Sequence, residues 1–91
     1  MPDVMKVGGV TGWMRVAGQA DAASIPVSSH LFAETNAHLL AVTPTAHWLE
    51  VLDLGRSILA NPIKVIDGMV TAQGPGLGLE WDETAVAKYL V

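Results

Sequence analysis

The feature that most constrains the fold is an alternation of short apolar runs with stretches of helical spacing in the first 52 residues. Three short apolar runs alternate with two helically spaced stretches, in the order Val4–Val7, Thr11–Ala23, Ile25–Ser28, Leu31–Val42 and Trp48–Leu52. The turns between them have few residues. This order predicts an α/β fold, β-α-β-α-β, with parallel strands joined by right-handed crossovers.

The last third of the chain follows a different pattern. Ile63–Ile66 and Met69–Ala72 are separated by Asp67-Gly68, which predicts a hairpin with a two-residue type I′ turn. Asp82 is placed to cap a final helix that runs to about Leu90. We therefore predict a small hairpin-plus-helix tail after the parallel strands.

The composition predicts that much of the surface of this chain faces other protein. Charged residues make up 15% of the 91 residues, against about 25% in an average soluble protein, and hydrophobic residues reach 51%. A small domain has a high surface-to-volume ratio and should need more polar residues than average. Three parallel strands would also leave both edges of the sheet open. Both observations indicate a piece of something larger.

Several classes of protein are excluded. No run of about 18 apolar residues occurs, and no secretory signal is visible, so we expect a cytoplasmic chain with no membrane partner. The absence of cysteine excludes disulfides and thiolate metal sites. A net charge of −4 without a Lys/Arg cluster argues against nucleic acid as a partner.

Three ionisable residues lie where reactive groups of parallel α/β proteins gather, at the ends of strands. Asp3 adjoins the first strand, His30 follows the second and Glu50 lies in the third. A carboxylate that hydrogen-bonds one imidazole nitrogen raises the basicity of the other, and a second carboxyl group could act as an acid. Spacing alone leaves open that all three residues are structural.

Other candidate sites are weaker. His38 and His47 have no carboxylate at ligand spacing, so neither predicts a metal site. The glycine-rich turn at residues 8–12 lacks the spacing of a phosphate-binding loop, and close packing of the turn is the alternative.

Several motifs resemble the mandelate racemase subgroup of the enolase superfamily, in the same order. Met1–Trp13 is similar to the segment of its sixth barrel strand, Ser28–Phe32 to its seventh-strand histidine motif, Ala37–Glu50 to the next helix and eighth strand, and Lys88–Val91 to its C-terminus. The resemblance implies a C-terminal fragment of a (β/α)8-type barrel. Residues 1–56 would then belong to the barrel, and residues 57–91 would pack outside it.

The resemblance also implies roles for individual residues. His30 would be the general base, Asp3 would orient it and raise its basicity, and Glu50 would donate a hydrogen bond to the substrate carboxylate. The apolar neighbours Leu31 and Leu52 would line the substrate pocket. Enzymes of this subgroup bind Mg²⁺ through carboxylates on earlier strands, and this chain lacks those strands, so none of its residues is predicted to be a metal ligand.

The implied reaction is removal of the α-proton of a 2-hydroxy carboxylate, as in racemisation of mandelate, with this chain inactive alone. A sugar-acid dehydratase of the same superfamily is one alternative. Another is a non-catalytic truncated product that only assembles with other chains. We expect a homo-oligomer, or association with the missing part of the barrel.

Overall fold

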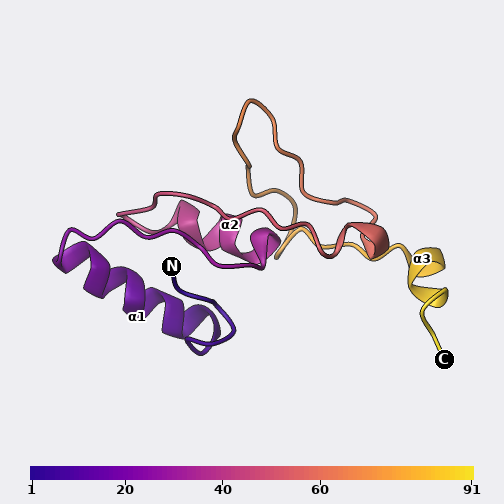
Figure 1. Ribbon diagram of the computed structural model, residues 1–91, viewed down its shortest axis with the longest axis horizontal. Coiled ribbons are helices and arrows are strands. Elements are labelled where there is room, and N and C mark those ends of the chain that lie inside the picture. Colours follow the sequence, from indigo (N-terminus) through magenta and orange to yellow (C-terminus); the bar gives the residue numbers. More distant parts are fainter.

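The computed structural model describes residues 1–91 as an elongated arrangement of short helices and extended segments. The helices are α1 (Gly9–Ala22), α2 (Ala33–Ala41) and α3 (Glu83–Ala87), with a 3₁₀ turn, η1, at Arg56–Ile58. The N-terminus lies near α1, whereas the C-terminus lies beyond α3 at the other end of the molecule (Figure 1). None of the helices has both the length and the hydropathy required to cross a membrane.

No continuous strand forms where three were predicted, and only isolated bridges, all but one of their residues outside the predicted ranges, join the extended segments; this corrects the predicted sheet. Parallel bridges join Asp3 with His30 and Val27 with Ala46. The segment around residues 27–30 therefore lies between the other two and pairs with both. The bridges have the predicted parallel direction, but no continuous ladder forms, because the register between the second and third segments changes along their length.

The predicted strand Val4–Val7 is wrong, since the extended segment ends at Asp3. One carboxylate oxygen of Asp3 accepts hydrogen bonds from the backbone N–H groups of Met5 at 2.9 Å and Lys6 at 3.3 Å. The Asp3 carbonyl accepts from Lys6 and Val7, each at 3.0 Å. An aspartate that binds the backbone two residues ahead favours a turn over a strand. The apolar run consequently becomes a tight turn that leads into α1.

Helix α1 begins at Gly9, two residues before its predicted start, and packs against the turn that precedes it. Gly12 faces that turn: a Cβ atom at this position would overlap the backbone carbonyl of Val7. Gly18, on the same helix, has open space at the same place. A glycine in a helix interior destabilises it by about 0.5–1 kcal/mol relative to alanine, so Gly12 is present for close packing.

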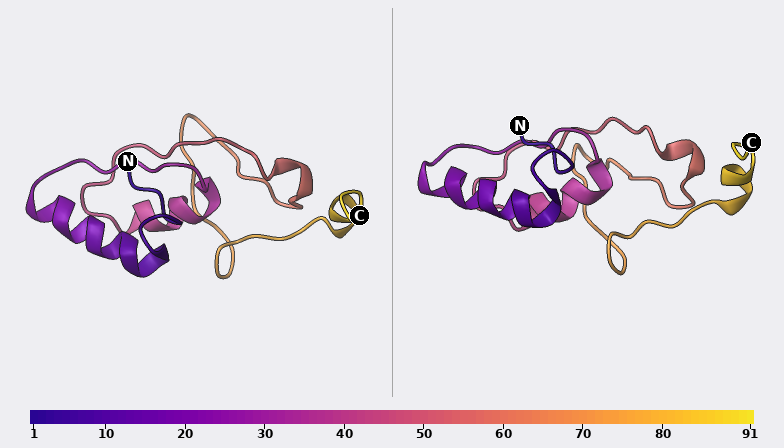
Figure 2. Two further views of the ribbon diagram at one scale, coloured as in Figure 1. Left: turned by 60° about the horizontal axis from the view of Figure 1, so that its bottom comes forward. Right: turned by 90° about the horizontal axis from the view of Figure 1, so that it is seen from below.

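A small apolar core lies between the two longer helices and the middle extended segment. Its buried members are Val4, Trp13, Ala17, Ala20, Val27 and Leu39. The Trp13 side chain is fully buried, and its indole N–H donates to the Thr43 hydroxyl at 3.0 Å. Thr43 in turn donates to the carbonyl of Leu39 at 2.7 Å. Helices α1 and α2 thus cover one face of the extended segments (Figure 2).

Many large apolar side chains remain exposed, as the composition predicts. They include Ile25, Trp48, Val51, Leu52 and Leu54 in and beside the second and third extended segments. Trp48 is 67% exposed and Leu54 is 74% exposed. The apolar excess of this chain therefore lies on its surface, where it is available to cover other protein.

The tail contains the predicted turn at Asp67-Gly68 and a final helix, but the predicted hairpin strands Ile63–Ile66 and Met69–Ala72 reduce to the single bridge between Ile66 and Met69. Ile66 and Met69 exchange two backbone hydrogen bonds of 2.9 Å, and both turn residues have positive φ, 51° at Asp67 and 74° at Gly68. These angles confirm a type I′ turn. Asp82 caps α3 as predicted, accepting from the N–H of Ala85 at 2.9 Å, but the helix ends at Ala87 instead of Leu90.

Candidate active site

The first pairing between the second and third extended segments has regular parallel geometry. Val27 donates its N–H to the carbonyl of Thr45 and accepts the N–H of His47, each at 2.8 Å. In a parallel pair, a residue that bonds both neighbours of its partner is level with that partner. Val27 is therefore level with Ala46.

The pairing shifts by one residue farther along. Ser29 donates its N–H to the carbonyl of Trp48 at 2.9 Å. The N–H of Glu50 donates to the side-chain hydroxyl of Ser29, also at 2.9 Å. Ser29 is thus level with Leu49. From Val27 to Ser29 the second segment advances by two residues, whereas from Ala46 to Leu49 the third segment advances by three. The third segment therefore contains one extra residue, as in a β-bulge.

The extra residue decides which side chain stands beside His30. With the shift, His30 is level with Glu50; a regular ladder would put Leu49 there. Because successive side chains of an extended segment point to opposite faces, residues at the same level share a face. The parallel bridge from His30 to Asp3 places a third side chain at that level. Asp3, His30 and Glu50 therefore lie on three neighbouring segments, on the face opposite buried Val27 and the helices.

The structure brings two of the predicted site residues into direct contact. Oδ2 of Asp3 lies 3.0 Å from Nδ1 of His30. Asp3 is buried, at 8% exposed, whereas the His30 side chain is 40% exposed. Burial by itself would raise the pKa of Asp3. The hydrogen bonds from His30 and from the backbone of Met5 and Lys6, together with the charge of His30, outweigh burial and lower that pKa below its ordinary value.

An ionised Asp3 fixes the tautomer of His30. A carboxylate can only accept hydrogen bonds, so Nδ1 of His30 carries the proton and donates it to Asp3. The other ring nitrogen, Nε2, is then left without a proton in the neutral imidazole. This is the arrangement of a base held in one orientation by an anionic partner.

Glu50 is anchored by the backbone beside His30. Its Oε2 accepts the N–H of Leu31 at 2.6 Å, which leaves Oε1 free to bind another group. Leu31 and Phe32 both have positive φ, 54° and 45°, a conformation that costs a non-glycine residue about 1–2 kcal/mol. This sharp turn directs the Leu31 N–H toward Glu50 instead of continuing the strand.

Two buried polar residues support this turn and were not found from the sequence. Asn36, on α2, has no exposed surface, and its side-chain N–H groups donate to the carbonyls of Leu31 at 2.6 Å and His30 at 3.4 Å. Ser29 is also fully buried. Asn36 carries no local motif, and Ser29 lies within the Ser28–Phe32 histidine motif, which was the one signal that could have drawn attention to it.

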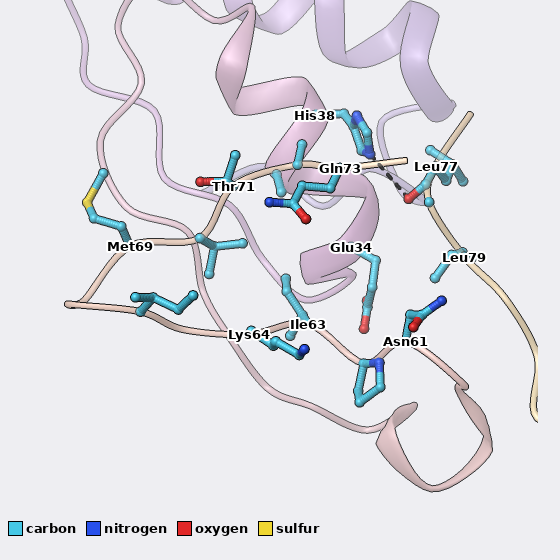
Figure 3. Close-up of a pocket in the computed structure, with 16 residues that line it drawn as sticks. Glu34, His38, Asn61, Ile63, Lys64, Met69, Thr71, Gln73, Leu77 and Leu79 are labelled. Carbon is cyan, nitrogen blue, oxygen red and sulfur yellow. Dashed lines mark hydrogen bonds between the residues drawn. The ribbon is translucent and has the colours of Figure 1, made fainter. Parts of the chain in front are cut away.

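The predicted pocket residues are not enclosed in this chain. Leu31 is partly buried and Leu52 is 53% exposed. The chain does have a cleft of about 420 Å³, but it lies between α2 and residues 61–79 and includes none of the predicted site residues. Figure 3 shows its polar lining, with Glu34 and His38 from α2 and Lys64 from the hairpin. We do not identify this open cleft with the candidate active site.

No cluster of three or more His, Asp or Glu side chains in residues 1–91 could hold a metal ion. Asp3 and His30 already satisfy one another, and Glu50 binds the backbone of Leu31. The residues of this chain therefore do not form a magnesium site of their own.

The parallel segments, the helices on one face and the acid–base side chains on the other are features of α/β enzymes whose sites lie at strand ends. A protein-family model described as "Enolase C-terminal domain-like" matches residues 1–85. The chain belongs to this family of the enolase superfamily.

One solved structure and two curated relatives illustrate the family. The structure of an enolase from Bradyrhizobium, complexed with magnesium and mandelic acid, is 70% identical in sequence and has a TM-score of 0.96. The match covers 100% of this chain and 25% of the Bradyrhizobium chain. A D-gluconate dehydratase of Thermoproteus tenax is 36% identical over 97% of this chain and 20% of its own length. A 3,6-anhydro-alpha-L-galactonate cycloisomerase of Streptomyces coelicolor is 35% identical over 99% of this chain and 26% of its own length.

This chain thus spans about a fifth to a quarter of the proteins that it resembles. Its similarity extends to enzymes of different reactions, so membership of the family does not select one reaction. Magnesium is bound in the Bradyrhizobium structure and in that of a racemase from Streptomyces coelicolor, which agrees with Mg²⁺ as the cofactor that the resemblance to the mandelate racemase subgroup implies.

Proposed function

We propose that this chain supplies the general base and the general acid of a Mg²⁺-dependent enzyme that removes the α-proton of a 2-hydroxy carboxylate. The observation that carries the proposal is the placement of Asp3, His30 and Glu50 at one level of three neighbouring segments, with Asp3 bound to His30. The metal ligands and the base for the opposite face of the substrate would lie outside these 91 residues.

His30 would act as the base through Nε2. Its Nδ1 is committed to Asp3, and its side chain is 40% exposed, so Nε2 can reach a bound substrate. As Nε2 takes the α-proton, the imidazole becomes positively charged beside the Asp3 carboxylate, and this ion pair stabilises the product of the proton transfer. The electron pair of the broken C–H bond moves into the substrate carboxylate, giving an enediolate.

Glu50 would act on that carboxylate. Oε2 is held by the Leu31 N–H, so Oε1 is the oxygen that can carry a proton and donate a hydrogen bond. A donor aimed at an oxygen that gains charge stabilises the transition state more than the ground state. Return of a proton to the α-carbon from the opposite face would complete a racemisation.

The side chains next to the site favour a hydrophobic substrate. Leu31 follows the base directly and Leu52 lies two residues after the acid, and both are apolar. The hydroxyl groups of a sugar acid would be left unpaired against them, at a cost of about 1–3 kcal/mol for each buried group. A mandelate-like aryl hydroxy acid is therefore our first choice, in agreement with the ligand of the Bradyrhizobium structure.

A sugar-acid dehydratase is the second candidate, favoured by the similarity to the D-gluconate dehydratase of Thermoproteus tenax. The same His30 would then assist departure of the β-hydroxyl group after the α-proton is removed. The two reactions share their first step, so Asp3, His30 and Glu50 serve both, and only the apolar neighbours Leu31 and Leu52 favour the racemisation.

We further propose that the chain functions only when assembled, with the remainder of a barrel or with other copies of itself. Its exposed apolar side chains, Trp48, Leu52 and Leu54 among them, motivate this proposal. The purified 91-residue chain should bind dyes that report exposed apolar surface and should elute as an oligomer in size-exclusion chromatography. A monomer with a sharp thermal transition and no dye binding would contradict it.

The proposed activity can be tested in a chimera. The matching quarter of the Bradyrhizobium enolase is replaced by this chain, and exchange of the α-proton of each mandelate enantiomer is followed by NMR in D₂O with Mg²⁺. His30→Asn should slow exchange of one enantiomer by about 10²–10⁴-fold, the usual contribution of a positioned base. Exchange of the other enantiomer should persist.

His38→Asn is the matched control, because His38 bonds the carbonyl of Leu77 in the tail, away from the site. It should leave both exchange rates unchanged. Unchanged exchange in the His30→Asn chimera would remove His30 from the mechanism. Dehydration of gluconate without racemisation of mandelate would select the second candidate.

A further inference from the structure

The Ser29 side chain takes the place of a backbone group in the pairing that positions Glu50. In a regular parallel pair, the N–H of the residue after Leu49 would bond the carbonyl of Ser29. Here the N–H of Glu50 bonds the Ser29 hydroxyl at 2.9 Å, while the Ser29 N–H bonds the carbonyl of Trp48 at 2.9 Å. Ser29 is 0% exposed, so bulk solvent does not compete for this hydrogen bond.

This hydrogen bond lies at the point where the register changes. Loss of the extra residue from the pairing would shift the third segment by one position and turn its side chains to the opposite face. Leu49 would then stand beside His30, and Glu50 would face the apolar core. The shifted pairing places Glu50 correctly, and the Ser29 hydroxyl is the only side-chain group that bonds the Glu50 backbone there.

We propose that Ser29 is a positioning residue that holds Glu50 on the same face as His30. This proposal rests on the proposed function, in which Glu50 is the acid and His30 is the base. Ser29 does not touch the substrate and acts through the backbone of Glu50. Ser29 and Leu31 flank His30 in the sequence, and both bind Glu50: the Ser29 hydroxyl accepts its backbone N–H, and the Leu31 N–H donates to its carboxylate.

The neighbouring Ser28 offers a matched control. Its hydroxyl accepts the N–H of Trp48 at 3.3 Å and lies 3.4 Å from Nδ1 of His47, in a partly exposed position. It has the same chemistry one residue away, on the opposite face, with longer contacts that water can replace. Ser28→Ala should therefore leave the position of Glu50 unchanged.

The structural part of the test uses the 91-residue chain and does not depend on activity. In ¹H–¹⁵N spectra, the short bond to a carboxylate should shift the Leu31 amide proton downfield. Ser29→Ala should abolish this shift, whereas Ser28→Ala should retain it and Ser29→Thr, which keeps a hydroxyl, should restore it. A Leu31 amide that is unchanged in Ser29→Ala would overturn the proposal.

If Ser29→Ala gives no dispersed spectrum, Ser29→Cys makes the same comparison with a side chain of similar size that accepts hydrogen bonds poorly. In the chimera, Ser29→Ala should lower kcat for mandelate by about 10²-fold with little change in KM, as expected for a small displacement of a catalytic group. Equal kcat values in Ser29→Ala and Ser28→Ala would overturn the proposal. If the unsubstituted chimera has no activity, the proposed function fails and the spectra still decide the role of Ser29.

Discussion

The first 50 residues and the last 35 differ in how their structure is held. In the first region, buried side chains from α1, α2 and the middle segment meet in one core, and the candidate site joins Asp3 to His30, 27 positions away. In the tail, Leu59 and Ala85 are the only buried residues. Its order comes from local turns and from short pairings such as Leu59 with Trp81.

The difference shows which kind of structure can position chemistry. Asp3, His30 and Glu50 come from three segments, and their alignment depends on a core that fixes all three at once. The tail has polar groups as well, among them Glu80 and Asn61, but these pair at the surface. We propose that the tail, residues 57–91, packs outside a barrel and plays no direct part in the chemistry.

The largest effect should come from removing the central side chain of the first region. Trp13→Ala deletes a fully buried indole and leaves the Thr43 hydroxyl without its donor. We expect a loss of about 3–5 kcal/mol in the free energy of unfolding, which is most of the stability of a small domain. Urea denaturation of the 91-residue chain measures it.

Trp81→Ala, in the tail, is the control for that loss, since Trp81 is 53% exposed. It should change the free energy of unfolding by less than about 1 kcal/mol, within the range of substitutions outside a core. Equal losses for the two tryptophans would mean that the tail shares the core, and the contrast between the regions would fail.

A smaller, pH-dependent effect should come from Asp3→Asn. The pKa of Asp3 is lower in the folded chain than its unfolded value of about 3.9. The ionised carboxylate therefore stabilises the fold above that unfolded pKa, and this contribution is lost as the pH falls through the folded pKa. The thermal midpoint of Asp3→Asn should lie below that of the unsubstituted chain at neutral pH, with the gap closing below pH about 3.9.

Glu80→Gln sharpens the comparison, because it removes an exposed tail carboxylate whose partner is the Asn61 amide. Because Glu80 is exposed, the thermal midpoint of Glu80→Gln at neutral pH should stay close to that of the unsubstituted chain. A gap for Asp3→Asn that widens in acid would contradict the direction of the Asp3 pKa shift.

The smallest effect should come from the cap of α3. Asp82→Ala removes the side chain that accepts the N–H of Ala85, worth about 1 kcal/mol to the helix. Because α3 has only five residues and buries only Ala85, the loss should stay local. Hydrogen exchange of the α3 amides should accelerate, while exchange of the Trp13 and Leu39 amides stays unchanged. Faster exchange in the core would show that the two regions unfold together.

Local chemistry allowed much of the fold to be predicted. The type I′ turn at Asp67-Gly68, the Asp82 cap and both longer helices follow from patterns within a few residues, and the parallel direction of the pairing follows from the order of the elements along the chain. The expected strand Val4–Val7 was wrong for a local reason as well. Its apolar character suggested a strand, but the Asp3 side chain binds the next backbone N–H groups and turns the chain.

The sequence by itself determined which ionisable residues stand at the ends of the extended segments, because those positions depend on the order of elements along the chain. Only the tertiary structure decided that Glu50, and not Leu49, shares a face with His30. That choice depends on one extra residue in the pairing, on the buried Ser29 hydroxyl and on the Asn36 side chain that holds a left-handed turn. These contacts join residues that are 5 to 21 positions apart, and no short-range pattern encodes them.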